Sequence, residues 1–309
     1  MARNWSARDW PAPNWSVEIG ALVGQVRERY LHPDVAEQIG EVLAGRLADG
    51  AYRDLADERA FAVAVTGDMQ SVNGDLHLSV RYTEREIPGS PGDAVDEGPL
   101  RADQARRTGH GFTKVERLDG NVALLDIRKF YDPGVGGAGE AAVAAMTMVA
   151  SADALLIDLR RNGGGEPDMV MFVSSYLFDT HTHLVDLVFA DRTLQYWTAP
   201  FTPGPTFGGS KPVWVLTSAA TISGGEGMTY QLQQSGRATV VGEVTAGAAN
   251  FHYPARLSAH LMAAVPSGYP VDPVSGGNWE GTGVQPDVAV RAGDAFGVGY
   301  ELALAQLHR

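Results

Sequence analysis

From residue 122 onward, short and almost uninterrupted apolar runs alternate with longer segments of helical periodicity. The runs predict buried strands at Val122–Ile127, Ala154–Leu159, Val213–Thr217 and Thr239–Val241. Helices are predicted around 140–151, 167–178 and 224–235, with a closing helix at Ala295–Leu307. Strands without polar alternation lie in sheets that are covered on both faces. The chain therefore predicts an α/β domain with a buried sheet, over which the segment 181–211 forms a surface insertion.

The first part of the chain is organised differently. Apolar residues at helical spacing predict three short helices, typical of a small bundle, at Ser16–Tyr30, Val35–Leu47 and about Leu55–Met69. After Asp75 the period changes to two, which predicts a strand that carries His77. Residues 84–108 are rich in Gly, Pro and charge and predict a linker loop. The predicted domains are a helical one at 1–83 and an α/β one at 109–309.

Charge and residue usage exclude several classes of function. The chain has 24 basic and 37 acidic side chains, a formal net charge of −13, which disfavours nucleic acid and anionic membranes as partners. No apolar run approaches the ~18–20 residues that span a bilayer, and the start lacks the apolar segment of a secretory signal. Cysteine, His-Glu-x-x-His and phosphate-binding glycine motifs are absent from the sequence, so we expect a cytoplasmic protein without metal or cofactor. Tryptophans at 5, 10 and 15 predict an arm that docks on the body or makes a dimer contact in a homo-oligomer.

Two strand-to-helix junctions concentrate the residues suited to chemistry. One contains Gly163-Gly164-Gly165, where glycine lets backbone N–H groups approach an anion at a helix start, with a plain tight turn as the alternative. At the other, Ser223 precedes a helix that starts near Gly224. Its hydroxyl would lie at the positive end of that helix, with the Gly224 N–H placed for a substrate oxygen. Ser223 is a candidate nucleophile, with a simple N-cap as the alternative.

A serine nucleophile needs a base and an acid that orients it. Lysines are scarce in the sequence, so the histidines supply the main candidates. His77, which follows Asp75 at a domain junction, is the first candidate base, and His110 and His252 are the competing ones. Glu280, in a glycine-flanked loop, is the candidate acid. Glu226 is interpreted as a structural residue that caps the helix after Ser223.

Taken in order, these segments resemble the tail-specific (C-terminal processing) protease superfamily. The resemblance is greatest to the branch that contains interphotoreceptor retinoid-binding protein and the tricorn protease core. The matching stretches are Asp75-Leu76-His77, Gly111 to Pro133, Asp158 to Gly165, Thr217 to Glu226, Gly242 to Ala248 and Gly281 to Asp287.

The resemblance implies a helical N-terminal domain followed by a crotonase/Clp-protease-like α/β domain. It implies Ser223 as the nucleophile, His77 as the base and Glu280 as the acid that orients the base. The oxyanion hole would use the N–H groups of Gly224 and Gly164. The expected substrate is a peptide or a small amide, ester or lactone that is cleaved through an acyl-enzyme.

Several positions depart from the family's pattern. Ala248 stands where the Ser–Lys branch has its lysine, which favours a histidine base. Leu76 stands where tricorn-like members have a serine, so the fourth polar group is either missing or supplied by Asp75. The stretch between Tyr82 and Phe112 is too short for the peptide-binding PDZ module of many relatives. Two alternative functions stay open: a non-catalytic carrier of an apolar ligand, and an acyl transferase or cyclase that uses the same site.

Overall fold

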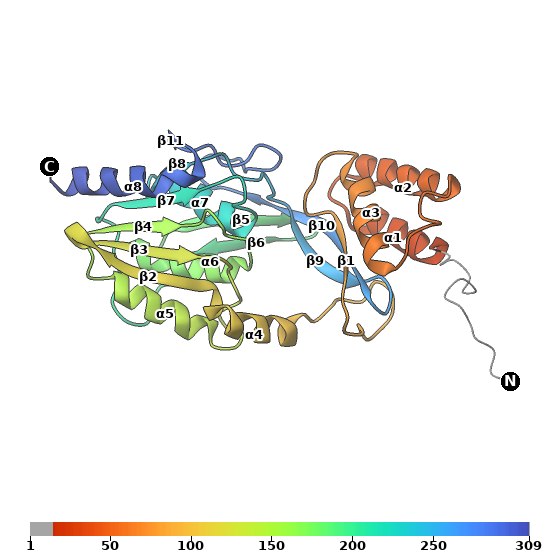
Figure 1. The fold of residues 1–309 in the computed structure, drawn as a ribbon, viewed down its shortest axis with the longest axis horizontal. Helices are drawn as coiled ribbons and strands as arrows, with labels where there is room; N and C mark the ends of the chain where they lie inside the picture. Colours follow the sequence, from red (N-terminus) through yellow and green to blue (C-terminus); the bar gives the residue numbers. More distant parts are fainter. Residues whose placement is uncertain (1–14, 309) are drawn as a thin grey trace. The chain divides into compact units, whose positions relative to one another are not determined.

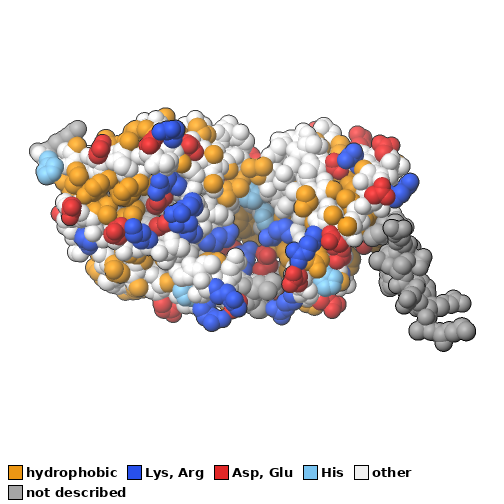
Figure 2. Space-filling model, in the orientation of Figure 1, with side chains coloured by type: hydrophobic (Ala, Val, Ile, Leu, Met, Phe, Trp, Pro, Cys, Tyr) orange, Lys and Arg blue, Asp and Glu red, His pale blue; other side chains and the backbone are white. Residues whose placement is uncertain are grey.

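The computed structural model describes residues 15–308 and consists of two compact units (Figure 1). The first contains the residues up to Val95 together with His252–Ser267, and the second contains Asp96–Phe251 together with the residues from Gly268 onward. Figure 2 shows acidic and basic side chains interspersed on the visible face of each unit. A strand labelled β10 (Leu261–Val271) contributes its first part to one unit and its last part to the other.

The first unit is a three-helix bundle with a short strand. Its helices, which correspond to the three predicted ones, are α1 (Ser16–Arg29), α2 (Pro33–Ala48) and α3 (Glu58–Gln70). Proline opens α2, and Asp57 caps α3 by accepting a hydrogen bond from Ala60 N at 2.8 Å. Strand β1 (Ser79–Tyr82) pairs antiparallel with Leu261–Ala264 of β10.

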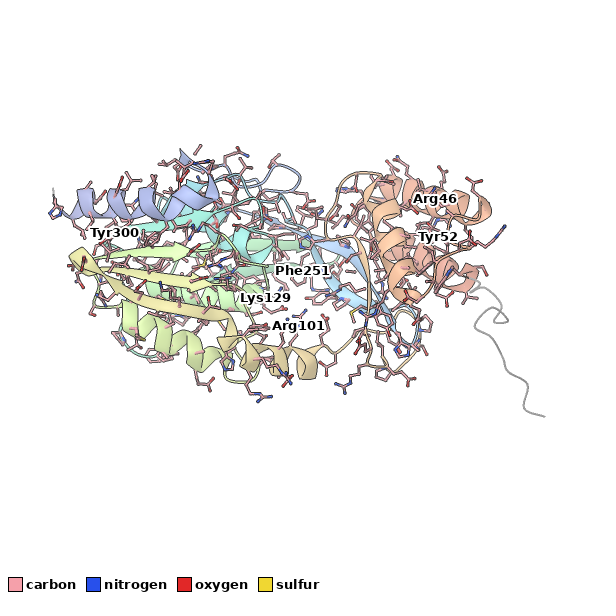
Figure 3. All side chains as sticks on the ribbon, in the orientation of Figure 1. Arg46, Tyr52, Arg101, Lys129, Phe251 and Tyr300 are labelled. Carbon is pink, nitrogen blue, oxygen red and sulfur yellow. The ribbon has the colours of Figure 1, made fainter. Side chains whose placement is uncertain are left out.

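The core of the bundle is formed by apolar side chains from all three helices, including Leu22, Ile39, Leu43, Phe61 and Met69. Trp15 stacks on Phe61, with 4.3 Å between the ring centroids. The other two tryptophans of the predicted arm, Trp5 and Trp10, lie outside the described residues. Arg46 and Tyr52 both donate hydrogen bonds to Asp68, which ties α2 and the turn after it to α3 (Figure 3).

The second unit is built on a six-stranded sheet with the strand order β11-β8-β7-β4-β3-β2. These strands are β2 (Phe112–Leu118), β3 (Val122–Ile127), β4 (Ala154–Asp158), β7 (Val213–Thr217), β8 (Thr239–Gly242) and β11 (Val288–Ala289). Neighbouring strands are parallel throughout except that β2 is antiparallel to β3. The four central strands correspond to the four predicted ones.

Helices cover both faces of this sheet, as the apolar runs predict. They are α5 (Ala138–Val149), α6 (Pro167–Ser174), α7 (Gly224–Gln234) and α8 (Ala292–Leu307). Leu155 and Ile157 of β4 pack with residues of α5, α6 and α7, whereas Leu156 packs with α8 on the other face (Figure 1). The α/β class with a preceding helical region is thus confirmed, and it is consistent with the crotonase/Clp-protease-like expectation.

A second sheet was not predicted. The segment interpreted as a surface insertion contains the antiparallel strands β5 (His183–Phe189) and β6 (Thr193–Trp197), and Gly268–Val271 of β10 pairs with β5. Strand β9 (Phe251–Arg256) also pairs with β10. Strand β10 is hard to predict because it contains Pro266, Gly268 and Pro270, and prolines inside an apolar run argue against a strand.

The predicted linker is also partly structured, since α4 (Gly98–Arg107) lies within residues 84–108. Arg101 of this helix forms ion pairs with Glu97 and Glu166. The division into domains at 1–83 and 109–309 stays a prediction. Within residues 15–308 no helix combines the length and apolar character that crossing a bilayer requires. The cytoplasmic location and the homo-oligomer contact stay predictions.

Candidate active site

The two predicted junctions meet at one edge of the six-stranded sheet. Strands β4 and β7 are parallel neighbours, so the turns that follow them lie side by side. The turn after β4 approaches Ser223 so closely that a Cβ added to Gly164 would lie 2.7 Å from Ser223 Cβ. A Cβ on Gly224 would lie 2.8 Å from Gly165 O. Glycine is therefore required on both sides of this contact.

Ser223 lies in a strained backbone conformation at the start of α7. Its φ of 55° and ψ of −120° are rare for a residue with a side chain, and such conformations cost of order 1–3 kcal/mol. Residues 218–223 lead from β7 into α7 and place Ser223 at the positive end of the helix, where a nucleophile elbow also places its serine. Ser223 is also the N-cap of α7 and forms a capping box with Glu226, so the alternative interpretation as a cap describes the same residue.

Glu226 holds the turn in place. Its carboxylate is fully buried and accepts hydrogen bonds from Ser223 N (2.8 Å), Gly247 N (2.6 Å), Ala248 N (3.0 Å) and Thr245 Oγ1 (2.5 Å). Burial raises the pKa of Glu226, and the four hydrogen bonds oppose that rise. The interpretation of Glu226 as a structural residue is confirmed, and it also ties α7 to the loop at 245–248.

Glu226→Gln is expected to lower the free energy of unfolding by about 2–4 kcal/mol, because an amide NH₂ would face backbone N–H groups and leave donors unpaired. Urea denaturation measures this change. Glu140→Gln on the exposed surface of α5 is the matched control and should stay within about 0.5 kcal/mol of the wild type. Equal stability of the two variants would contradict the role of Glu226.

The backbone donors beside Ser223 differ from the predicted pair. Gly164 N donates to Asn162 Oδ1 at 2.8 Å, so this N–H is already engaged within the turn. Asn162 is itself buried and donates from Nδ2 to Ile127 O at 2.9 Å. Gly165 lies directly against Gly224, and neither of their N–H groups donates to another group within residues 15–308. The N–H groups of Gly224 and Gly165 are therefore available to an acceptor, whereas that of Gly164 is engaged.

Glu280 is anchored in the same unit. Its Oε2 accepts hydrogen bonds from Ala249 N (2.6 Å) and Asn250 N (3.0 Å). The neighbouring Trp279 donates from Nε1 to Ala248 O at 3.0 Å. Glu280 and Trp279 therefore bond to residues 248–250, and Glu226 bonds to residues 245–248 just before them. Because Glu226 also accepts a hydrogen bond from Ser223 N, these contacts connect the Glu280 loop to the Ser223 turn.

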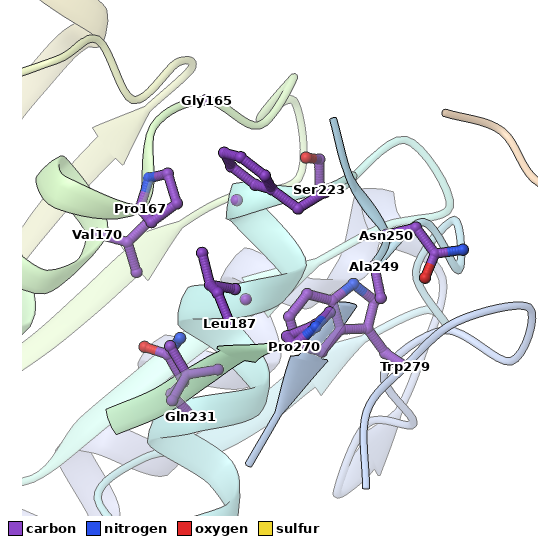
Figure 4. A pocket seen from close by; sticks show the side chains of 14 residues that line it. Gly165, Pro167, Val170, Leu187, Ser223, Gln231, Ala249, Asn250, Pro270 and Trp279 are labelled. Atoms are coloured by element: carbon purple, nitrogen blue, oxygen red, sulfur yellow. The ribbon is translucent and has the colours of Figure 1, made fainter. Parts of the chain in front are cut away.

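A small pocket opens beside Ser223 (Figure 4). Its volume is about 60 Å³. The lining residues are Gly165, Pro167, Val170, Val185, Leu187, Ser223, Gly224, Gly227, Gln231, Ala249, Asn250, Phe251, Pro270 and Trp279. The pocket is mostly apolar, as is typical of a subsite that receives part of a substrate.

The candidate histidines lie on other elements. His77 and Asp75 belong to the first unit, in the turn just before β1, where Asp75 Oδ1 accepts a hydrogen bond from His77 N at 2.9 Å. This side-chain turn explains why the strand begins after His77 rather than at it. The His252 ring lies 5.5 Å from the His77 ring within the same unit. His110 belongs to the second unit, with a φ of 55°, and its ring faces Gly137.

Two family profiles together match most of this chain. The sequence profile of Peptidase family S41 matches residues 121–290, and the profile of the N-terminal domain of peptidase S41 in eukaryotic IRBP matches residues 18–111. Only residues 112–120 separate the two matches, far fewer than the ~50 residues of a further domain such as a PDZ module.

Several solved structures share the fold of this chain. A lipoprotein from Streptococcus agalactiae is 13% identical, with a TM-score of 0.63 over 99% of this chain and 100% of the other. A putative peptidase from Parabacteroides merdae is 18% identical, with a TM-score of 0.59 over 98% and 97%. The photosystem II D1 C-terminal processing protease is 15% identical, with a TM-score of 0.53 over 90% and 94%. Because the S41 profile covers more than half of the chain, the protein belongs to peptidase family S41.

Proposed function

We propose that this serine peptidase-like hydrolase cleaves a peptide, or a small amide, ester or lactone, through an acyl-enzyme formed on Ser223. Family membership supports the reaction class. The observation that carries the assignment to Ser223 is its strained elbow at the start of α7, packed against the glycine turn after β4. Strain of this kind persists only where the surrounding structure enforces it.

In the proposed reaction, Ser223 Oγ bonds to the acyl carbon while its proton passes to the His77 imidazole. The carbonyl oxygen becomes an oxyanion that the N–H groups of Gly224 and Gly165 stabilise; loss of one such donor typically costs about 2.7–4 kcal/mol of barrier. His77 then gives the proton to the leaving group, and water releases the acyl group by the reverse sequence. Gly165 takes the place of Gly164 in this proposal because the Gly164 N–H is engaged by Asn162.

Two arguments support the proposed partners of Ser223. Ala248 stands where a Ser–Lys peptidase would have its lysine, so the base must come from another residue type, and the resemblance assigns His77. Glu280 is proposed to orient the protonated imidazole. Its carboxylate is held in place by two backbone N–H groups, as a residue that orients another side chain needs to be.

Labelling by a fluorophosphonate probe tests the proposal. The wild type should be labelled in the folded state, and Ser223→Ala should lose the label entirely. Ser235→Ala, near the other end of the same helix, is the matched control and should be labelled like the wild type. Undiminished labelling of Ser223→Ala would show that Ser223 is not the nucleophile.

A further inference from the structure

The pocket beside Ser223 ends at a buried polar group that the proposed chemistry does not use. Gln231 is only 6% exposed, and its Oε1 accepts no hydrogen bond within residues 15–308. A buried amide oxygen without a partner is costly, and in native proteins it usually marks a site for a ligand or water. Gln231 lines the same pocket as Ser223 (Figure 4).

Helix geometry directs this amide toward the nucleophile. Ser223, Gly227 and Gln231 are spaced by four residues and share one face of α7. Side chains on a helix lean toward its N-terminus, which is the end that carries Ser223. Gly227 lies between them without a side chain. A Cβ there would lie 3.3 Å from the Trp279 ring, which packs against this face of the helix, and 3.9 Å from Gln231 Nε2.

The walls of the pocket limit what can reach Gln231. Val170, Leu187, Pro270 and Trp279 are apolar, and none of the lining residues carries a charge. A charged side chain would therefore lose its hydration without gaining a counter-ion. The volume of about 60 Å³ is well below the ~150 Å³ of an engineered cavity that accepts benzene, which favours an unbranched side chain over an aromatic ring.

We infer that Gln231 is a specificity-determining residue that selects glutamine as the substrate residue whose carbonyl is attacked. This inference rests on the proposed function of Ser223. The methylene groups of the substrate side chain pack against the apolar walls. Its terminal carboxamide then donates to Gln231 Oε1 and accepts from Gln231 Nε2, as two amides do when they pair. A glutamate side chain, which is an acceptor only, would leave Oε1 unpaired.

Peptidyl diphenyl phosphonates test the pocket directly, because they react with an active serine and differ only in the side chain beside phosphorus. The rate constants of inactivation should rank glutamine above methionine, with glutamate and phenylalanine lowest. In Gln231→Leu the ratio of the glutamine rate to the methionine rate should fall by about tenfold or more. Gln234→Leu, three residues later on the same helix and outside the pocket lining, is the matched control and should keep the wild-type ratio.

The outcomes separate this inference from the proposed function. A wild type that prefers methionine, or a Gln231→Leu variant with an unchanged ratio, overturns the role of Gln231 while Ser223 remains the nucleophile. Failure of every peptidyl phosphonate, with a simple fluorophosphonate still labelling Ser223, overturns it as well. Loss of all labelling from the wild type overturns the proposed function and the inference together. Gln234→Leu should be labelled by the simple fluorophosphonate as fast as the wild type.

Discussion

Ser223→Ala is expected to lower kcat for a peptide or activated ester by roughly 10⁴- to 10⁶-fold, the range seen when a serine hydrolase loses its nucleophile. The reason is that no acyl-enzyme can form, and only the oxyanion donors and substrate binding remain. Initial rates at saturating substrate measure the loss. Urea denaturation should show that the variant is folded, since alanine keeps the same backbone turn and Glu226 still accepts a hydrogen bond from the backbone N–H at position 223.

A smaller loss would separate the competing functions. If Ser223→Ala keeps a rate within tenfold of the wild type, Ser223 is not the nucleophile and a carrier of apolar ligands becomes the better account. Ser235→Ala should keep the full rate, because its hydroxyl only bonds to carbonyl oxygens at the other end of α7.

His77→Ala is expected to lower kcat by roughly 10³- to 10⁶-fold, because the Ser223 hydroxyl loses its proton acceptor. The rise of kcat/KM with pH that a histidine base produces should disappear in this variant. Added imidazole should restore part of the rate. A variant with only a structural defect would show neither signature.

Alanine at the two competing histidines serves as the comparison. His110→Ala and His252→Ala should each keep the rate within about tenfold of the wild type and retain its pH profile. A greater loss in either of them than in His77→Ala would show that the base is assigned to the wrong histidine.

Most of the second unit could be predicted from the sequence because its central strands are buried on both faces. Burial on both faces leaves a continuous apolar run that only a strand between helix layers explains, as in β4 and β7. The strands of the second sheet give a weaker signal. Strand β6 alternates between exposed and half-buried residues, and β10 contains prolines where it changes pairing partners. Helix α4 could not be predicted because its segment is polar on all sides and has no apolar stripe to distinguish it from a loop.

The candidate site could be predicted only as far as the residue types at the two strand-to-helix junctions reveal it. Ser223 and the glycine turn stand out because strand ends, small residues and helix starts are visible along the chain. The choice between Gly164 and Gly165 as an oxyanion donor depends on a hydrogen bond from Asn162, which no spacing reveals. The burial of Gln231 beside the pocket could not be predicted, because it depends on contacts with residues that are distant in the sequence.

The central claim is that the acyl group of the substrate is transferred to Ser223 Oγ. Mass spectrometry of a digest, taken after brief reaction with p-nitrophenyl acetate and an acid quench, tests it most directly. We expect an acetyl group on the peptide that contains Ser223, formed in a burst together with the release of nitrophenol. The acetyl group should be absent from Ser223→Ala. Continued turnover with the acetyl group on a different residue, or with no acetylated peptide at all, would contradict it.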